Sequence, residues 1–191
     1  MKALIISLLA FLTVFGVGVQ AQSVVAKPVL SKNDKKIFAD FLKRTNRYIA
    51  RREQLRTKAP PLAKEATPEQ IQAFKVALQN TVRADRVNMR QGDVFTQQIA
   101  ILIRKSIKDE FKGWEASELR KQVLESDTKG VPLKVNVPYP ETKELVQMPP
   151  TLLLNLPLLH KDLRYRFIGR NLAILDRDSS LIIDFMKDAL P

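Results

Sequence analysis

Hydrophobic residues recur every three or four positions through the first two thirds of the chain, which is the spacing of amphipathic helices. The first such stretch follows Ser31, a residue that can cap a helix together with Asp34. Later stretches follow Thr67-Pro68 and Thr96, which are further helix-start signals. The pattern predicts helices over residues 31–58 and 67–87, from Thr96 to the residue before Gly113, and over 115–125.

The pattern changes after these helices. Residues 131–157 contain six prolines, which remove backbone donors and favour extended chain. We expect an irregular arm there, with a short strand at 133–137 and one helical turn near 151–156. From Leu163 onward apolar and polar residues alternate, as in a half-buried strand. Strands are expected over 163–167, 172–176 and 181–186, separated by turns at 169–171 and 177–180.

These elements predict an α+β fold: about four helices, a proline-rich arm and a C-terminal three-stranded antiparallel meander. We expect residues 31–191 to form a single domain. Its parts would be the helical part (31–126), the arm (131–157) and the meander (163–188).

The N-terminus has the features of a cleavable signal peptide. Lys2 precedes a run without charged residues, Ala3–Val19, and small residues stand before a cut that we predict after Ala21. Residues 22–30 would be a disordered leader. The alternative is an uncleaved membrane anchor, although the run is slightly short for a span. We therefore expect an exported protein, periplasmic or secreted, whose mature chain has no transmembrane span.

Composition limits the chemistry of the mature chain. There is no cysteine, which excludes thiol catalysis, Cys–zinc sites and iron–sulfur clusters. The net charge is +12, and loss of Lys2 with the signal peptide lowers it to +11. Such a charge attracts polyanions, which outside the cytoplasm are phospholipid head groups and acidic envelope polymers, and nucleic acid is not an expected partner. Alternatively, the charge only keeps the protein soluble.

The first predicted helix has a basic face, and it supplies the candidate anion- or partner-binding residues Lys43, Arg44, Arg47, Arg51 and Arg52. A helix that is basic on one side and apolar on the other can lie on an anionic membrane. It can equally pack on the core with its basic side in solvent. Both interpretations stay open from the sequence.

Arg164 and Arg166 are two further candidates for binding an anion. Both lie on one face of the first predicted strand, with Arg170 and Arg177 in the adjacent turns. Guanidinium groups so placed could hold a carboxylate or a phosphate. The alternative is that they protect a strand edge from pairing with another chain.

Catalytic and metal-binding signals are scarce. His160 is the only histidine, and we interpret it as a solvated turn residue. Asp176–Ser180 has the alternating oxygens of a calcium loop, but a plain turn explains these residues as well. Asp176 and Asp184 could act as paired carboxylates if the strands brought them together. Gly92-Asp93 is interpreted as a turn, with an anion-receiving helix start as the alternative. We therefore predict no catalytic residue, no metal and no cofactor.

A resemblance rests on four segments: Gln91–Phe95 (QGDVF), Tyr165–Leu172 (YRFIGRNL), Leu181–Phe185 (LIIDF) and Asp188–Pro191 (DALP). Together they resemble a family of uncharacterised exported bacterial proteins. The resemblance implies export and architecture, and it carries no site.

The meander is also faintly similar to that of RcnB-type periplasmic proteins, which are linked to nickel and cobalt handling. Those proteins are rich in histidine, whereas this chain has only His160. The metal function is therefore not carried over.

Two functions follow from these observations. The first is a non-catalytic envelope or secreted protein that binds an anionic or protein partner through its basic surface. The alternative is a small secreted hydrolase that uses His160 or the carboxylates of Asp176 and Asp184. The scarcity of catalytic side chains favours the first. The sequence names neither the partner nor the oligomeric state.

Overall fold

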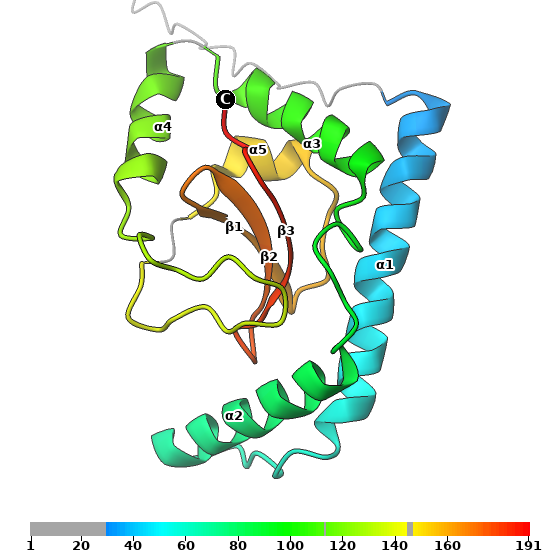
Figure 1. The fold of residues 1–191 in the computed structure, drawn as a ribbon, viewed down its shortest axis with the longest axis vertical. Coiled ribbons are helices and arrows are strands. Elements are labelled where there is room, and N and C mark those ends of the chain that lie inside the picture. The colour runs from blue at the N-terminus through cyan, green and yellow to red at the C-terminus, as the bar shows by residue number, and fades with distance from the viewer. Residues whose placement is uncertain (1–29, 113, 145–146) are drawn as a thin grey trace, which may run out of the picture.

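The computed structural model describes residues 30–112, 114–144 and 147–191. The expected signal peptide, its cut after Ala21 and the leader up to residue 29 lie outside the described residues. The chain has the predicted α+β class, with helices followed by a C-terminal antiparallel sheet (Figure 1). The elements are α1 (Lys32–Arg56), α2 (Pro68–Asp85), α3 (Gln97–Glu110), α4 (Trp114–Glu125), α5 (Pro150–Asn155), β1 (Leu163–Ile168), β2 (Asn171–Asp176) and β3 (Ile182–Met186).

The capping signals act as the sequence predicts at the first two helices. The Ser31 hydroxyl accepts a hydrogen bond from the backbone of Asp34, and Thr67 does the same for Gln70. Thr96 precedes α3, but its hydroxyl makes no capping hydrogen bond. Local sequence therefore predicts where these helices start, including α3, whose predicted capping hydrogen bond does not form.

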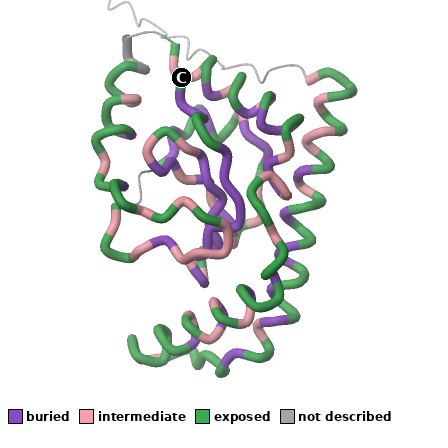
Figure 2. Tube along the Cα trace, in the orientation of Figure 1, coloured by how far each residue is buried: buried purple, intermediate pink, exposed green. Residues whose placement is uncertain are grey.

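The sheet has the strand order β1-β2-β3, and both pairs are antiparallel. One face packs on the helices in a core that includes Phe41, Ile103 and Phe167. The other face packs on the arm through Tyr139 and Phe185. The strands are accordingly among the most buried parts of the chain (Figure 2).

The predicted strand at residues 133–137 is wrong. Backbone hydrogen bonds from Lys134 to Pro132 and from Val137 to Lys134 form turns there. Asn136 has a φ of 64°, a left-handed conformation that interrupts a strand. The arm still reaches the edge of β3, because Asn136 N–H donates to the Ile182 carbonyl at 2.8 Å.

The apolar face of α1 is part of the core. Phe41, Tyr48, Ile49 and Leu55 are all buried, and α1 runs along one side of the molecule with α2 crossing its end (Figure 1). Of the two interpretations of this helix, the structure has the packed one, since the face that would enter a membrane is covered. Within the described ranges, no helix is long and apolar enough to cross a membrane.

Candidate anion-binding site

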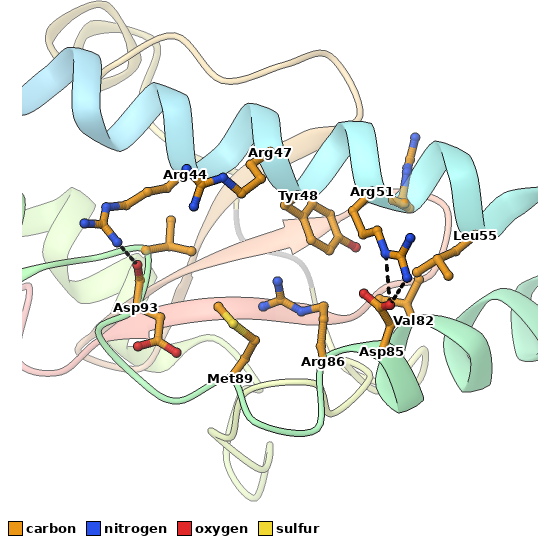
Figure 3. Close-up of a pocket in the computed structure, with 12 residues that line it drawn as sticks. Arg44, Arg47, Tyr48, Arg51, Leu55, Val82, Asp85, Arg86, Met89 and Asp93 are labelled. Atoms are coloured by element: carbon orange, nitrogen blue, oxygen red, sulfur yellow. Dashed lines mark hydrogen bonds and ion pairs between the residues drawn. The ribbon is translucent and has the colours of Figure 1, made fainter.

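A pocket of about 440 Å³ opens between α1, the end of α2 and the loop after it; we call it the α1–α2 pocket (Figure 3). Its polar lining is dominated by five arginines, against two aspartates. The charged residues are Arg44, Arg47, Arg51, Arg52, Arg86, Asp85 and Asp93. Apolar groups complete the wall, among them Leu55, Val82, Met89 and the ring of Tyr48. The lining therefore combines positive charge with hydrophobic surface.

Four of the predicted residues line this pocket: Arg44, Arg47, Arg51 and Arg52. Arg44 Nη1 donates to the Asp93 carbonyl at 2.9 Å, and Arg47 has no hydrogen bond or ion pair within the described part of the chain. Arg51 Nε donates to Asp85 Oδ1 at 2.9 Å, so its charge is matched by a carboxylate and ties α1 to α2. Arg44 and Arg47 thus keep their charge available.

Arg86 forms the floor of the pocket and was missed by the sequence analysis. It is 8% exposed, its Nε donates to Asn136 Oδ1 and its Nη2 to the Ile183 carbonyl, both at 2.8 Å. Its guanidinium carbon lies 4.8 Å from the centroid of the Tyr48 ring, a cation–π contact. Burial lowers the pKa of Arg86, which the charges of Asp184, Asp93 and Asp85 partly offset from beyond ion-pair distance. An anion in the pocket would supply the missing negative charge.

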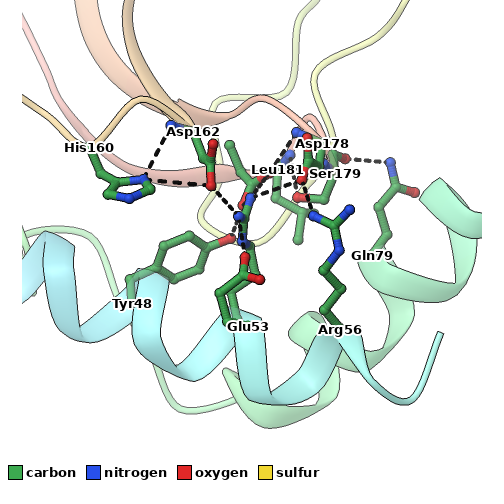
Figure 4. Close-up of polar contacts among 11 residues, drawn as sticks. Tyr48, Glu53, Arg56, Gln79, His160, Asp162, Asp178, Ser179 and Leu181 are labelled. Atoms are coloured by element: carbon green, nitrogen blue, oxygen red, sulfur yellow. Dashed lines mark hydrogen bonds and ion pairs between the residues drawn. The ribbon is translucent and has the colours of Figure 1, made fainter. Parts of the chain in front are cut away.

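Arg52 lines the same pocket but is already neutralised by surrounding carboxylates, of which Glu53, Asp162 and Asp178 are labelled in Figure 4. Its buried guanidinium contacts Asp162 at 2.6 Å, Asp176 at 3.2 Å, Asp178 at 3.3 Å and Glu53 at 2.5 Å. Burial lowers the pKa of Arg52, but the surrounding carboxylates raise it more, so the net pKa is above the ordinary value. Arg52 is therefore a structural cation that joins α1 to the sheet.

Asp176 is the centre of that ion-pair cluster. Its Oδ2 accepts a hydrogen bond of 2.6 Å from the Tyr48 hydroxyl. Its Oδ1 accepts backbone N–H groups of Asp178 and Ser179 at 2.8 and 2.9 Å, which is the geometry of an Asx turn. The turn interpretation of residues 176–180 is confirmed.

Across the ranges that the structure describes, no group of three or more His, Asp or Glu side chains is placed to hold a metal ion.

The alternative interpretation of Gly92-Asp93 was that the backbone N–H groups there bind an external anion. In the structure the carboxylate of Asp184 occupies that position. Its carboxylate accepts backbone N–H groups of Gly92, Val94, Phe95 and Phe185 at 2.8 to 3.0 Å. Burial raises the pKa of Asp184, and these four backbone hydrogen bonds oppose that rise. The turn, with Gly92 at a φ of 93°, thus holds the protein's own carboxylate.

The structure does not gather the catalytic candidates of the sequence analysis. His160 Nδ1 accepts the backbone N–H of Asp162 at 3.3 Å, and its side chain is 36% exposed. Asp176 and Asp184 are both 0% exposed and hydrogen-bonded, and neither lines any of the four pockets in the described residues. His160, Asp176 and Asp184 therefore do not line a common pocket within the described ranges.

The remaining candidates lie in two other hollows. Lys43 lines a small one of about 190 Å³ next to the α1–α2 pocket, with Asp40, Arg44 and Arg47. Arg164 and Arg166 line a third hollow, of about 270 Å³, at the edge of β1. Arg170 does not line this hollow, and its Nη2 donates to the Leu190 carbonyl. The sequence candidates therefore divide between two separate basic sites.

A scan of the chain against protein-family models gives no match, and neither the curated proteins nor the solved structures contain one that matches. The geometry of the two basic sites is therefore the basis for the function.

Proposed function

We propose that this protein is an exported, non-catalytic binding protein whose α1–α2 pocket holds an anionic group of its partner. The proposal rests on the absence, in the described part of the chain, of carboxylate partners for Arg44, Arg47 and Arg86. All three line the pocket, and within the described residues none forms an ion pair with a carboxylate.

The pocket suits a small organic anion. A volume of about 440 Å³ lies within the usual range of small-molecule sites, about 300–1,000 Å³. Arg47 and Arg86 would donate charge-assisted hydrogen bonds to a carboxylate or phosphate. Leu55, Val82 and Met89 would contact an apolar body next to that group. A free solute and the acidic end of an envelope component share this chemistry.

A binding role also agrees with what the acidic residues do. Asp176 and Asp184 hold the fold together through hydrogen bonds, and neither lines a pocket of the described residues. A hydrolase would need an accessible base next to a substrate site. The alternative of a small secreted hydrolase gains no support from these contacts.

The test uses anilinonaphthalene sulfonate, an anionic aromatic probe, with mature protein and fluorescence titration. We expect binding that weakens from about 20 mM to about 500 mM salt, because opposite charges are screened. The double variant R44Q/R47Q should bind at least about tenfold more weakly, since it loses charge-assisted hydrogen bonds.

The matched control is K35Q/K36Q, which removes the same charge from exposed positions of α1 outside the pocket. It should bind as the unchanged protein does. If R44Q/R47Q retains full affinity, or if both variants lose it equally, the α1–α2 pocket is not the anion site. Export is tested separately, by N-terminal sequencing of the native protein, which should begin at Gln22.

A further inference from the structure

The hollow at the edge of β1, here called the β1 pocket, is lined by three arginines and one lysine, and no carboxylate lines it. Its cations are Arg164, Arg166, Arg177 and Lys161. In the α1–α2 pocket two aspartates accompany the arginines, so the β1 pocket is the more one-sided in charge. Such a concentration of like charge favours an anion.

Backbone geometry holds Arg164 and Arg166 together. Alternate residues of a strand share a face, and in β1 these two lie opposite Leu175 and Ala173 of β2. The Nε atoms of both arginines are buried and have no hydrogen-bond partner among the described residues. These Nε atoms have almost no accessible surface, so an anion in the pocket would meet the outer Nη groups, of which Arg166 Nη1 also donates to the Tyr165 carbonyl at 2.7 Å.

The electrostatic surroundings agree with this geometry. Burial and the charge of Arg177 lower the pKa of Arg164, which the charge of Asp176 partly offsets. Burial, together with the charges of Arg164 and Arg177, lowers the pKa of Arg166 to about 10. The three guanidinium groups therefore repel one another, and a bound anion would relieve the repulsion.

Exposed leucines surround the same pocket. Leu153 and Leu158 line it and are 43% and 88% exposed, and Leu154, the neighbour of Leu153, is 61% exposed. Large exposed apolar groups next to a charged cluster are typical of surfaces that meet a partner. A volume of about 270 Å³ is below the range of whole small-molecule sites, so only a head group would fit inside.

We propose that the β1 pocket and its leucines form a contact surface for anionic lipid, in which Arg164, Arg166 and Arg177 hold the lipid phosphate and Leu158 contacts the hydrocarbon. Interfacial binding of this kind combines buried apolar area with attraction to anionic head groups. The site is independent of the α1–α2 pocket.

The experiment is co-sedimentation of mature protein with vesicles of phosphatidylglycerol or of phosphatidylcholine. We expect binding to phosphatidylglycerol and at least about tenfold weaker binding to phosphatidylcholine. The variant R164Q/R166Q should bind phosphatidylglycerol about thirty-fold more weakly, from the loss of two arginines near an anionic surface. L158S should weaken binding about tenfold, since it removes one buried leucine from the contact.

Two controls match these changes. K35Q/K36Q removes the same charge from α1, and V87S changes another apolar residue that is 75% exposed. Both should keep the vesicle binding of the unchanged protein. Equal binding to the two lipids overturns the proposal, and so does equal loss in K35Q/K36Q and R164Q/R166Q.

Folding of each variant is checked by circular dichroism and its thermal midpoint. If R164Q/R166Q is not folded, R177Q takes its place, because Arg177 lies in a turn and its loss should still weaken binding at least about threefold. Full phosphatidylglycerol binding by folded R177Q and L158S would mean that these arginines only protect the edge of β1.

Discussion

The hydroxyl of Tyr48 in α1 donates a hydrogen bond of 2.6 Å to Oδ2 of Asp176 at the end of β2, across 128 positions of sequence. Arg52, one helical turn after Tyr48, binds the same carboxylate. Burial, followed by the charge of Asp176, raises the pKa of Tyr48 well above its ordinary value. The tyrosine therefore stays protonated and remains a donor throughout the neutral range.

Replacing Tyr48 with phenylalanine should lower the free energy of unfolding by about 1.5–3 kcal/mol, the usual contribution of a hydrogen bond to a charged group. Urea denaturation would measure the loss. Tyr165→Phe is the matched control, since that buried hydroxyl donates to a neutral carbonyl, of Pro157, at 2.9 Å. Its loss should cost about 1 kcal/mol. Equal losses in the two variants would contradict a special role for Asp176.

Arg52→Gln should destabilise the fold by about 3–5 kcal/mol, because Asp176 would keep a buried charge without its cation. Guanidinium denaturation would measure this loss in the free energy of unfolding. Arg56→Gln serves as the control, since Arg56 also binds Asp178 but is 39% exposed. That change should cost at most about 1 kcal/mol. A loss of this smaller size in Arg52→Gln would mean that the buried ion pairs are not required.

Asp184→Asn should cost about 1–3 kcal/mol, since an amide NH₂ would face backbone N–H groups that now have an acceptor. Hydrogen exchange should locate the effect at the amides of Val94 and Phe95. Asp188→Asn is the comparison, because Asp188 is exposed and asparagine tolerates its φ of 49°. Unchanged exchange at Val94 in Asp184→Asn would refute the role given to this carboxylate.

Arg51 sets the titration of Asp85. The hydrogen bonds and then the charge of Arg51 hold the pKa of Asp85 below the ordinary carboxyl value. A carboxyl whose pKa is lower in the folded chain stabilises it above the unfolded pKa, and this contribution is lost as pH falls through the folded pKa. An NMR titration should find the low pKa and find it raised in Arg51→Gln, while Arg83→Gln leaves it in place. An ordinary pKa for Asp85 in the unchanged protein would contradict the ion pair.

Local sequence signals were enough to predict the helices and the meander, because helix caps and the spacing of hydrophobic residues depend only on neighbouring positions. The strand expected at 133–137 failed since turns and the left-handed Asn136 replace it, which hydropathy alone does not reveal. The basic residues of the first helix formed one surface in the sequence analysis, but Arg52 is buried, and three of its four carboxylate partners lie more than a hundred positions away.

A signal for the buried arginines was nevertheless present. Arg52 lies four residues after Tyr48 and three before Leu55, so helical spacing puts it on the apolar face. Arg86 likewise follows Leu78 and Val82 at intervals of four. A charged residue on a buried face must find partners, and this would have predicted that Arg52 and Arg86 are structural cations or site residues.

The long reach of the Arg52 contacts also governs when the protein can fold. Residues 162–178 supply three of the four carboxylates that surround Arg52, and they lie more than a hundred positions after it. The buried cation of α1 is therefore fully compensated only after this distant segment has packed against the helix. Such non-local contacts make folding slow.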